Sequence, residues 1–282
     1  LTSTRAKVQG NEVRLYGVKW FSSATTSEIA LALARYEDSP EGSKGLSLFV
    51  VPTYLPLGSS TLNHIQVLRL KDKLGTWALP TAELNLEGAL AYPIGEKNQG
   101  VKTVASMLNI TRLYNSICSV GAMTRGLHLL RNYAKTRSVF GRPLSEQPLH
   151  VMNFAQEEVR MMAGFLLTMD LVHLLGREEC KAGSETESAV LRLMTPVCKS
   201  FTAKAAILNA SEVLEGFGGA GYIEDTGVAG LLRDAQVFPI WEGATHVLTL
   251  DLLRVLQKDE SIKSWTHYLK QKLRADKAGD LS

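Results

Sequence analysis

Apolar residues follow two different spacings along this chain of 282 residues, and the spacing changes near residue 95. Before that point, short runs of β-branched or alternating apolar residues are separated by Gly, Pro and Asn. Such runs predict half-buried strands, here at 5–8, 13–21, 28–36, 45–51, 65–70 and 82–86. Regular short strands with turn signals favour an antiparallel sheet or barrel.

The rest of the chain has apolar residues at every third or fourth position. This spacing predicts long helices, here at 100–136, 145–176, 185–215 and 243–257. Four long helices with short connections indicate a bundle. Because the strands come first and the helices afterwards, the fold class is α+β, and a parallel βαβ repeat is disfavoured.

Composition adds few constraints. The chain is 45% apolar and 21% charged, which is typical of a globular protein, and its net charge of +3 does not demand a polyanionic partner. The cysteines lie far apart, at Cys118, Cys180 and Cys198, so neither a metal knuckle nor a disulfide framework is indicated, and a reducing compartment is expected.

The sequence indicates neither a membrane span nor a signal peptide. There is no unbroken run of 18 apolar residues, and the first residues lack the apolar core of a signal peptide. We therefore expect a soluble intracellular protein, mitochondrial or cytoplasmic. Because the chain begins at Leu1, we expect the biological N-terminus to lie upstream.

Six residues from Gly216 to Gly221 form a glycine-rich cluster, GFGGAG. It looks like a nucleotide-binding loop, but it follows a predicted helix, whereas a Rossmann fingerprint follows a strand. Two interpretations stay open. The glycines can end a helix in left-handed conformations, or their bare backbone can let a cofactor come close.

The segment 233–246 is the most unusual in the chain. It places Glu242 between Trp241 and Gly243, shortly after Pro239 and where a helix is expected to begin. A carboxylate in an apolar setting can act as a general base near neutral pH. Alternatively, Glu242 caps the helix N-terminus, where negative charge is favourable. His246, four residues on, would share its helix face.

Taken together and in order, several motifs resemble those of the acyl-CoA dehydrogenase flavoprotein family. They are KWFSSA at 19–24, KLG at 73–75, RSVFG at 137–141, FGGAGY at 217–222, RD at 233–234 and IWEG at 240–243. Within the family, RLKDKLG at 69–75, QPL at 147–149 and IWEG are similar to the AidB-like branch, whose bacterial namesake is linked to alkylation damage and binds DNA.

The resemblance implies an architecture that agrees with the pattern of strands and helices. Residues 1–98 would be the later part of the middle β-domain, 99–258 an up-down C-terminal four-helix bundle, and 259–282 the start of a C-terminal helical extension. The family's N-terminal helical domain and its first flavin-binding loop would be absent from this sequence.

The resemblance also implies FAD as cofactor and assigns its contacts. Trp20 and Ser22 match an element that lies against the flavin. Arg137 and Phe140 match an element that contacts the FAD of a neighbouring subunit, and an arginine suits a pyrophosphate. Three further sets match positions that approach the dinucleotide, namely the pair Gly218 and Gly219, Ala244, and His246.

By the same resemblance, Glu242 is the catalytic base that removes the α-proton of an acyl-CoA thioester. Some family members carry the base immediately before the arginine that corresponds to Arg112, but Thr111 stands there in this chain. Arg112 would tune the base or help hold CoA, with an ordinary surface salt bridge as the alternative. Trp241 would narrow the mouth of the substrate cavity, and Asn109 stands where several members have a CoA-contacting aspartate.

The implied function is an FAD-dependent acyl-CoA dehydrogenase that forms trans-2-enoyl-CoA and passes electrons to an electron-transfer flavoprotein or similar acceptor. A homotetramer, a dimer of dimers, would complete the cofactor site. The alternatives are a protein that sequesters fatty acyl-CoA with little turnover and an AidB-like DNA-binding flavoprotein. The DNA alternative has a small electrostatic footprint, because residues 258–282 hold six Lys or Arg and four Asp or Glu.

Overall fold

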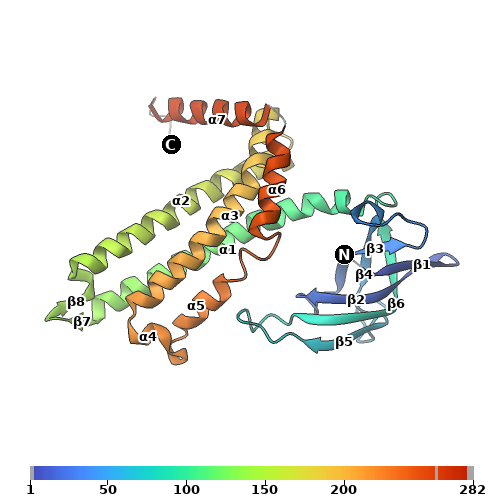
Figure 1. Cartoon of the computed structure of the whole chain (residues 1–282), viewed down its shortest axis with the longest axis horizontal. Coiled ribbons are helices and arrows are strands. Elements are labelled where there is room, and N and C mark those ends of the chain that lie inside the picture. The colour runs from blue at the N-terminus through green and yellow to red at the C-terminus, as the bar shows by residue number, and fades with distance from the viewer. Residues whose placement is uncertain (1–2, 258–259, 278–282) are drawn as a thin grey trace. The chain divides into compact units, whose positions relative to one another are not determined.

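The computed structural model describes residues 3–257 and 260–277 (Figure 1). The chain divides into two compact units, Leu1–Leu108 and Asn109–Ser282. The first unit holds the strands of the β-domain, and the second holds the helices. The long helix α1 (Gly100–Thr136) crosses the boundary between them.

Six strands form the sheet of the first unit, and each lies where the sequence predicts one. They are β1 (Arg5–Gln9), β2 (Glu12–Ser22), β3 (Ile29–Tyr36), β4 (Leu46–Pro52), β5 (Ile65–Leu70) and β6 (Ala82–Ile94). Their order is β2-β1-β3-β4-β6-β5, and an additional pairing of β2 with β6 closes five of them into a ring. The sheet is therefore barrel-like, as one of the two sequence alternatives has it.

One pairing differs from the antiparallel expectation. β1 and β3 run parallel, with Arg5 opposite Arg35, whereas the other pairings within this sheet are antiparallel. The reason is topological, because β2 turns back along one side of β1 and the chain then crosses to place β3 on the other side. Leu15 and Phe49 are fully buried in the core of this unit, on the inward face of alternating strands.

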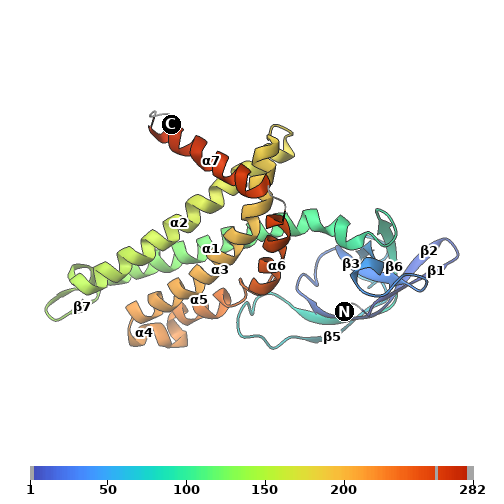
Figure 2. The same ribbon diagram turned by 45° about the horizontal axis from the view of Figure 1, so that its top comes forward.

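The second unit contains the predicted helices in the predicted order. After α1 come α2 (Pro148–Glu179), α3 (Glu185–Gly216), α4 (Gly219–Tyr222), α5 (Val228–Ala235), α6 (Thr245–Leu256) and α7 (Glu260–Lys277), with a small hairpin of β7 (Ser138–Val139) and β8 (Arg142–Pro143) after α1. The long helices α1, α2 and α3 run side by side in both ribbon views (Figures 1 and 2).

Helix α3 is the central helix of the unit, because it packs against α2, α5, α6 and α7. Its buried side chains join three apolar clusters with residues of α1, such as Leu113, Met123 and Leu127. Its start is fixed by a capping box, in which the Ser184 hydroxyl accepts from the Glu187 N–H and the Glu187 carboxylate accepts from the Ser184 N–H.

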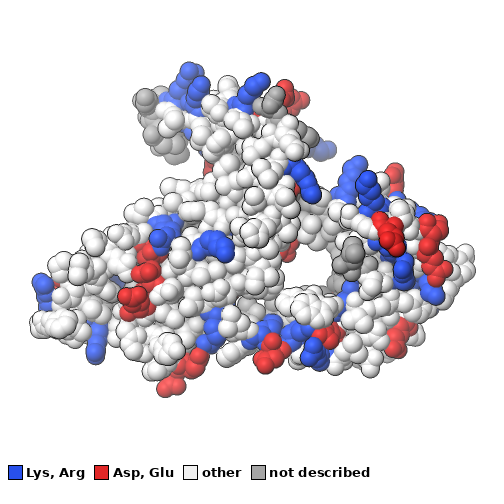
Figure 3. All heavy atoms as spheres, in the orientation of Figure 1, with Lys and Arg blue, Asp and Glu red and all other residues white. Residues whose placement is uncertain are grey.

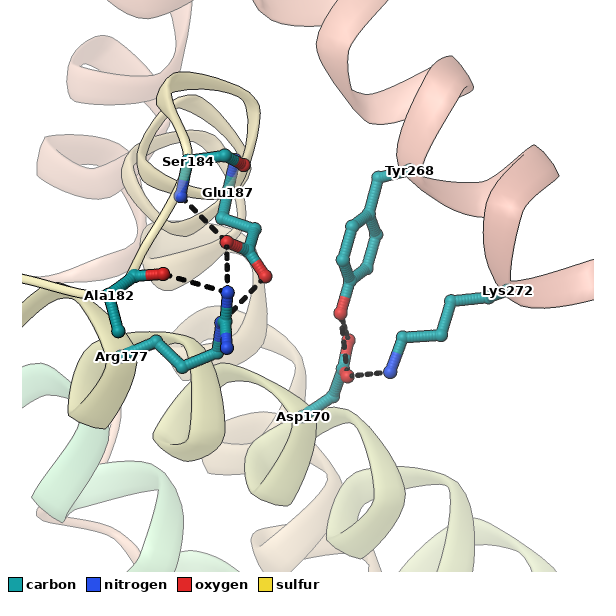
Figure 4. Close-up of polar contacts among 7 residues, drawn as sticks. All are labelled: Asp170, Arg177, Ala182, Ser184, Glu187, Tyr268 and Lys272. Carbon is teal, nitrogen blue, oxygen red and sulfur yellow. Dashed lines mark hydrogen bonds and ion pairs between the residues drawn. The ribbon is translucent and has the colours of Figure 1, made fainter. Parts of the chain in front are cut away.

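Helix α7 docks on α2 through a polar cluster (Figure 4). The Tyr268 hydroxyl donates to the carboxylate of Asp170 at 2.7 Å, and Lys272 Nζ lies 2.9 Å from the same carboxylate. Burial and the neighbouring Asp170 raise the pKa of Tyr268. α7 is helical over Glu260–Lys277, within the range 259–282 where a helical extension is expected, and residues 259 and 278–282 of that range lie outside the described part of the chain.

Within the described residues, α2 is the one helix long and apolar enough to cross a membrane by length and composition. Core helices of bundles often share this property, and α2 packs against α3.

Candidate active site

A loop between α5 and α6 carries Glu242 and is tied to α1 and α3. The loop follows α5 through successive backbone turns, among them Trp241 N–H to Val237 O at 3.0 Å. The amide Nδ2 of the buried Asn115, on α1, donates to Phe238 O at 3.1 Å. These contacts position the loop within the helical unit.

Glu242 adopts a left-handed backbone conformation with φ of +58°, and Gly243 follows with φ of +105°. Left-handed backbone is unfavourable for a residue with a Cβ by about 1–2 kcal/mol, so surrounding contacts must hold it. The half-buried side chain points to α1, where Thr111 Oγ1 donates to Glu242 Oε2 at 2.6 Å. The carboxylate therefore has a defined direction.

Arg112 lies beside this turn. Its Nε donates to the Glu242 backbone carbonyl at 3.2 Å, and its Nη1 lies 2.7 Å from Asp251 Oδ2 on α6. Arg192, on α3, binds the same carboxylate. Burial raises the pKa of Asp251, but hydrogen bonds from Arg192 and Arg112 outweigh it, and the pKa lies below its ordinary value. Arg112 is thus part of an ion network and not of an isolated surface pair.

Lys199, on α3, reaches the next carbonyl of the turn. Its side chain is 0% exposed, and Nζ donates to Gly243 O at 2.7 Å. Desolvation by burial lowers the pKa of this lysine from 10.5 to about 8. Glu242 and Gly243 therefore each have their carbonyl bound by a cationic side chain, one from α1 and one from α3.

The alternative in which Glu242 caps the N-terminus of the following helix is wrong. α6 begins at Thr245 with Ala244 at its N-cap, so Glu242 precedes the helix and its carboxylate binds Thr111. The left-handed turn at Glu242 and Gly243 is what delays the helix. For the same reason His246, which is exposed, is not one helical turn from Glu242 on a shared face.

The glycine cluster lines a cavity of about 630 Å³ in the helical unit. α3 ends at Gly216, and Gly218 follows with φ of +59°. Arg137, Gly218 and Gly219 line this cavity. A Cβ added at Gly218 or Gly219 would meet no atom within 4 Å. The backbone therefore faces open space beside an exposed arginine, an arrangement that fits an anionic dinucleotide.

Phe140 lies at the tip of the β7–β8 hairpin, with φ of +53° and 96% exposure. It does not line the cavity of Gly218, although Arg137 precedes it by three residues and does. An aromatic side chain this exposed makes few packing contacts within its own chain, so its ring is accessible to another molecule.

Trp20 and Ser22 lie near the end of β2 in the first unit. The indole of Trp20 is 66% exposed, and Lys71 Nζ lies 3.8 Å from its ring centroid in a cation–π contact. Ser22 is half-buried and pairs with Ala82 of β6. One side of the indole is therefore held by Lys71 while much of its surface stays accessible.

Comparison with known proteins relates both units to one family. The profile described as "Acyl-CoA dehydrogenase, C-terminal domain" matches residues 98–257, and that described as "Acyl-CoA dehydrogenase, middle domain" matches residues 1–89. This chain belongs to the acyl-CoA dehydrogenase family. The α+β fold that the sequence predicts is the fold of this family.

Individual acyl-CoA dehydrogenase relatives extend the match. Acyl-CoA dehydrogenase family member 11 of Caenorhabditis elegans is 48% identical over 91% of this chain and 42% of its own length. The putative acyl-CoA dehydrogenase AidB of Escherichia coli K12 is 34% identical over 92% of this chain and 46% of its own length. The chain thus spans less than half the length of either relative.

A solved acyl-CoA dehydrogenase structure has nearly the same fold. The crystal structure of C. elegans ACDH-11 in complex with C11-CoA superposes with a TM-score of 0.94 at 46% identity, over 99% of this chain and 48% of that one. That relative binds an acyl-CoA. Its likeness covers both the β-domain and the helical unit of this family member.

Sequence reasoning missed three contributors to the Glu242 turn, namely Lys199, Asp251 and Arg192. Lys199 left a signal, because it is a charged residue within a strongly apolar stretch of α3. Asp251 and Arg192 left none, since nothing in their local patterns distinguishes them from surface charges. For Thr111, the family resemblance indicates only that it cannot act as the base, and not that it binds Glu242.

Proposed function

We propose that this chain is the part of an FAD-dependent acyl-CoA dehydrogenase that carries the catalytic base, Glu242. The observation that supports this is the fixed, half-buried side chain of Glu242. Arg112 binds the backbone carbonyl of this residue, and Thr111 binds Oε2 of its carboxylate. A carboxylate held in one orientation is suited to take a proton from a bound substrate.

The substrate class is a fatty acyl-CoA thioester. Glu242 removes the proton from the α-carbon, the hydrogen on the β-carbon leaves with its electron pair, and the electron pair of the α C–H bond forms the double bond of trans-2-enoyl-CoA. FAD, when bound, supplies the hydride acceptor. The protein's tasks are to orient the thioester and to receive the α-proton at Glu242.

Each unit, taken by itself, carries residues that would contact FAD. In the β-domain, these are the accessible indole of Trp20 and the hydroxyl of Ser22. In the helical unit, Arg137 with Gly218 and Gly219 would hold the dinucleotide of a neighbouring subunit, and the open space over both glycines supports this fit. The remaining proposed contacts are Phe140, Ala244 and His246.

Arg112 and Trp241 are the proposed substrate-side residues. Arg112 is 8% exposed and bound to Asp251 and to the Glu242 carbonyl, which favours a role beside the base over a direct hold on CoA. Trp241, next to the base, would border the acyl cavity. We propose an electron-transfer flavoprotein or similar acceptor as redox partner, and a dimer of dimers as the functional assembly.

The sequestering alternative needs the same cavity and differs only in turnover. The comparisons do not support DNA as a partner. On the face shown in Figure 3, most of the helical unit is uncharged, its basic and acidic side chains are scattered, and α7 carries basic side chains together with acidic ones.

The deciding experiment is anaerobic mixing of the full-length flavoprotein with acyl-CoAs of varied chain length while flavin bleaching is followed. For Glu242→Gln, which keeps shape but removes the base, we expect bleaching slower by about 10²–10⁴-fold with FAD still bound. Glu178→Gln, at an exposed position of α2, is the matched control and should bleach at the wild-type rate.

Each outcome separates the alternatives. Tight acyl-CoA binding without bleaching in the wild type would favour sequestration. Near-wild-type bleaching by Glu242→Gln would show that another group acts as the base. DNA binding that persists between 50 and 200 mM salt would not be the electrostatic binding expected of a basic surface.

A further inference from the structure

Lys199 is a buried ammonium group that the function proposed above does not yet use. None of the salt bridges found among the described residues includes it, and its side-chain hydrogen bond is to Gly243 O at 2.7 Å. Burying a charge without an ion-pair partner is costly unless hydrogen bonds compensate. A methionine would fill similar space in this apolar stretch without that cost. What distinguishes the lysine is its donor.

The donor acts on the least relaxed part of the backbone near the base. Glu242 and Gly243 both have positive φ, and a residue with a Cβ in this region persists only when its surroundings hold it. Arg112 binds the carbonyl of Glu242, and Lys199 binds the carbonyl of Gly243. Two successive peptide units are therefore fixed from two different helices.

This arrangement controls where the carboxylate lies. The Glu242 side chain leaves the backbone immediately before the two held peptides, and its carboxylate ends 2.6 Å from Thr111 Oγ1. If the second peptide is released, the torsions of Gly243 are no longer fixed, the turn can relax so that φ of Glu242 returns toward its ordinary negative values, and the carboxylate moves with it. A displacement of about 1 Å of a catalytic group can lower a rate by about 10²-fold.

We propose that Lys199 is a positioning residue for Glu242, acting through its hydrogen bond to the carbonyl of Gly243. The proposal rests on the assignment of Glu242 as the base. Lys199 itself touches neither the substrate nor the cofactor in this role. Its contribution is to keep the left-handed turn in the conformation that aims the carboxylate.

The test uses the full-length flavoprotein and measures single-turnover flavin reduction by a saturating straight-chain acyl-CoA, with and without deuterium at the α-carbon. Lys199→Met removes the donor. Lys199→Gln keeps a polar group whose nitrogen falls one bond short of the carbonyl, and it serves if the methionine variant does not fold. Lys204→Met makes the same chemical change at an exposed position of the same helix.

For Lys199→Met and Lys199→Gln, we expect reduction to slow by about 10–100-fold, with FAD content, acyl-CoA affinity and the amplitude of bleaching close to wild type. The α-deuterium isotope effect should rise, because proton removal becomes more rate-limiting. A merely structural role would instead lower the amplitude or the FAD content and leave the rate and isotope effect of the folded fraction unchanged.

The proposal is overturned if both variants reduce flavin at the rate and with the isotope effect of Lys204→Met. It is also overturned if slowing comes only with loss of acyl-CoA affinity. Failure of the proposed function has a different signature, namely near-wild-type reduction by Glu242→Gln or no reduction by wild-type protein.

Discussion

Two turns in the helical unit have nearly the same φ and opposite surroundings. Gly218 has φ of +59° and Glu242 has φ of +58°. A side chain at Gly218 would meet nothing within 4 Å, whereas the turn at Glu242 is bound by Arg112, Lys199 and Thr111. At the open turn, around Gly218, glycine leaves the backbone accessible. At the held turn, formed by Glu242 and Gly243, donors from α1 and α3 fix the conformation of a residue that is not glycine.

The difference separates two ways of serving a site. An open glycine turn needs no support of its own, because glycine adopts positive φ readily, and it leaves backbone exposed to a ligand. A held turn stores strain that its neighbours must compensate. Substitutions at the open turn should therefore mainly lower the affinity for the ligand, whereas substitutions at the held turn should mainly lower the stability of the protein.

The largest effect on stability is expected at Arg112, which binds both the held turn and the carboxylate of Asp251. Arg112→Met removes the donor to the Glu242 carbonyl and leaves Asp251 with Arg192. We expect the free energy of unfolding, measured by urea denaturation, to fall by about 2–3 kcal/mol, at or just below the range for breaking a buried pair.

Arg131→Met is the matched control on α1, because its ion pair with Glu158 is largely exposed. This control should lose no more than about 1 kcal/mol. Equal losses in the two variants would mean that the network does not hold the turn.

The open turn should respond through cofactor affinity. Gly218→Val places a branched side chain at positive φ and into the cavity beside Arg137. Because ψ of Gly218 is −141°, a sparsely populated region for residues with a Cβ, we expect a cost of about 1–3 kcal/mol in stability. We also expect a loss of about tenfold or more in FAD affinity, equivalent to about 1.4 kcal/mol, by titration of the apoprotein.

Gly227→Val provides the comparison, since Gly227 also has positive φ and open space but lies outside that cavity. It should also lower stability, by about 1–2 kcal/mol for a left-handed residue with a Cβ, and leave FAD affinity unchanged. A parallel loss of FAD affinity in both variants would trace the effect to general destabilisation.

A smaller effect, on the rate of flavin reduction, is expected from removing the hydrogen bond to the Glu242 side chain. Thr111→Val keeps the shape but removes the hydrogen bond to Glu242 Oε2, worth about 1 kcal/mol, so flavin reduction should slow by about tenfold or less. Thr124→Val on the same helix removes only a bond to its own helix, at Val120 O. If the two variants reduce flavin equally fast, Thr111 has no part in orienting the base.

The sequence predicts the open turn better than the held one. Glycines after a long helix indicate positive φ by residue type alone, and the strands and long helices follow from periodicity. Positive φ at Glu242 has no such local signal, because it depends on donors 43 or more residues away in sequence, at Lys199 and Arg112. The helix was accordingly predicted two residues too early, at 243 where α6 begins at Thr245.

The parallel pairing of β1 with β3 is also not predicted by the sequence, because it depends on residues that are distant along the chain. Alternation of apolar residues identifies each strand and its buried face, but it does not carry the order in which strands pair. Asp251 illustrates the same limit for charges. Its partners, Arg112 and Arg192, lie 139 and 59 residues away.

The smallest effect concerns the pH dependence of the held turn. Burial lowers the pKa of Lys199 to about 8, so between that pH and 10.5 the folded protein has released a proton that the unfolded chain still binds. Stability then rises with pH across this window. The charged groups facing Lys199 are Arg112 from α1, Glu242 from the loop and Lys204 from α3 itself.

Relative to Lys199→Met, the wild-type protein should therefore gain less than about 1 kcal/mol of unfolding free energy between pH 7.5 and 8.5. Urea denaturation at both pH values measures this. Lys204→Met removes only the smallest of the effects on the pKa of Lys199, so it should stay closer to the wild type than to Lys199→Met. Stability curves that stay parallel for wild type and Lys199→Met would mean that the amine is not desolvated. The held turn would then be no less accessible to water than the open turn at Gly218, and the two turns would differ only in their hydrogen bonds.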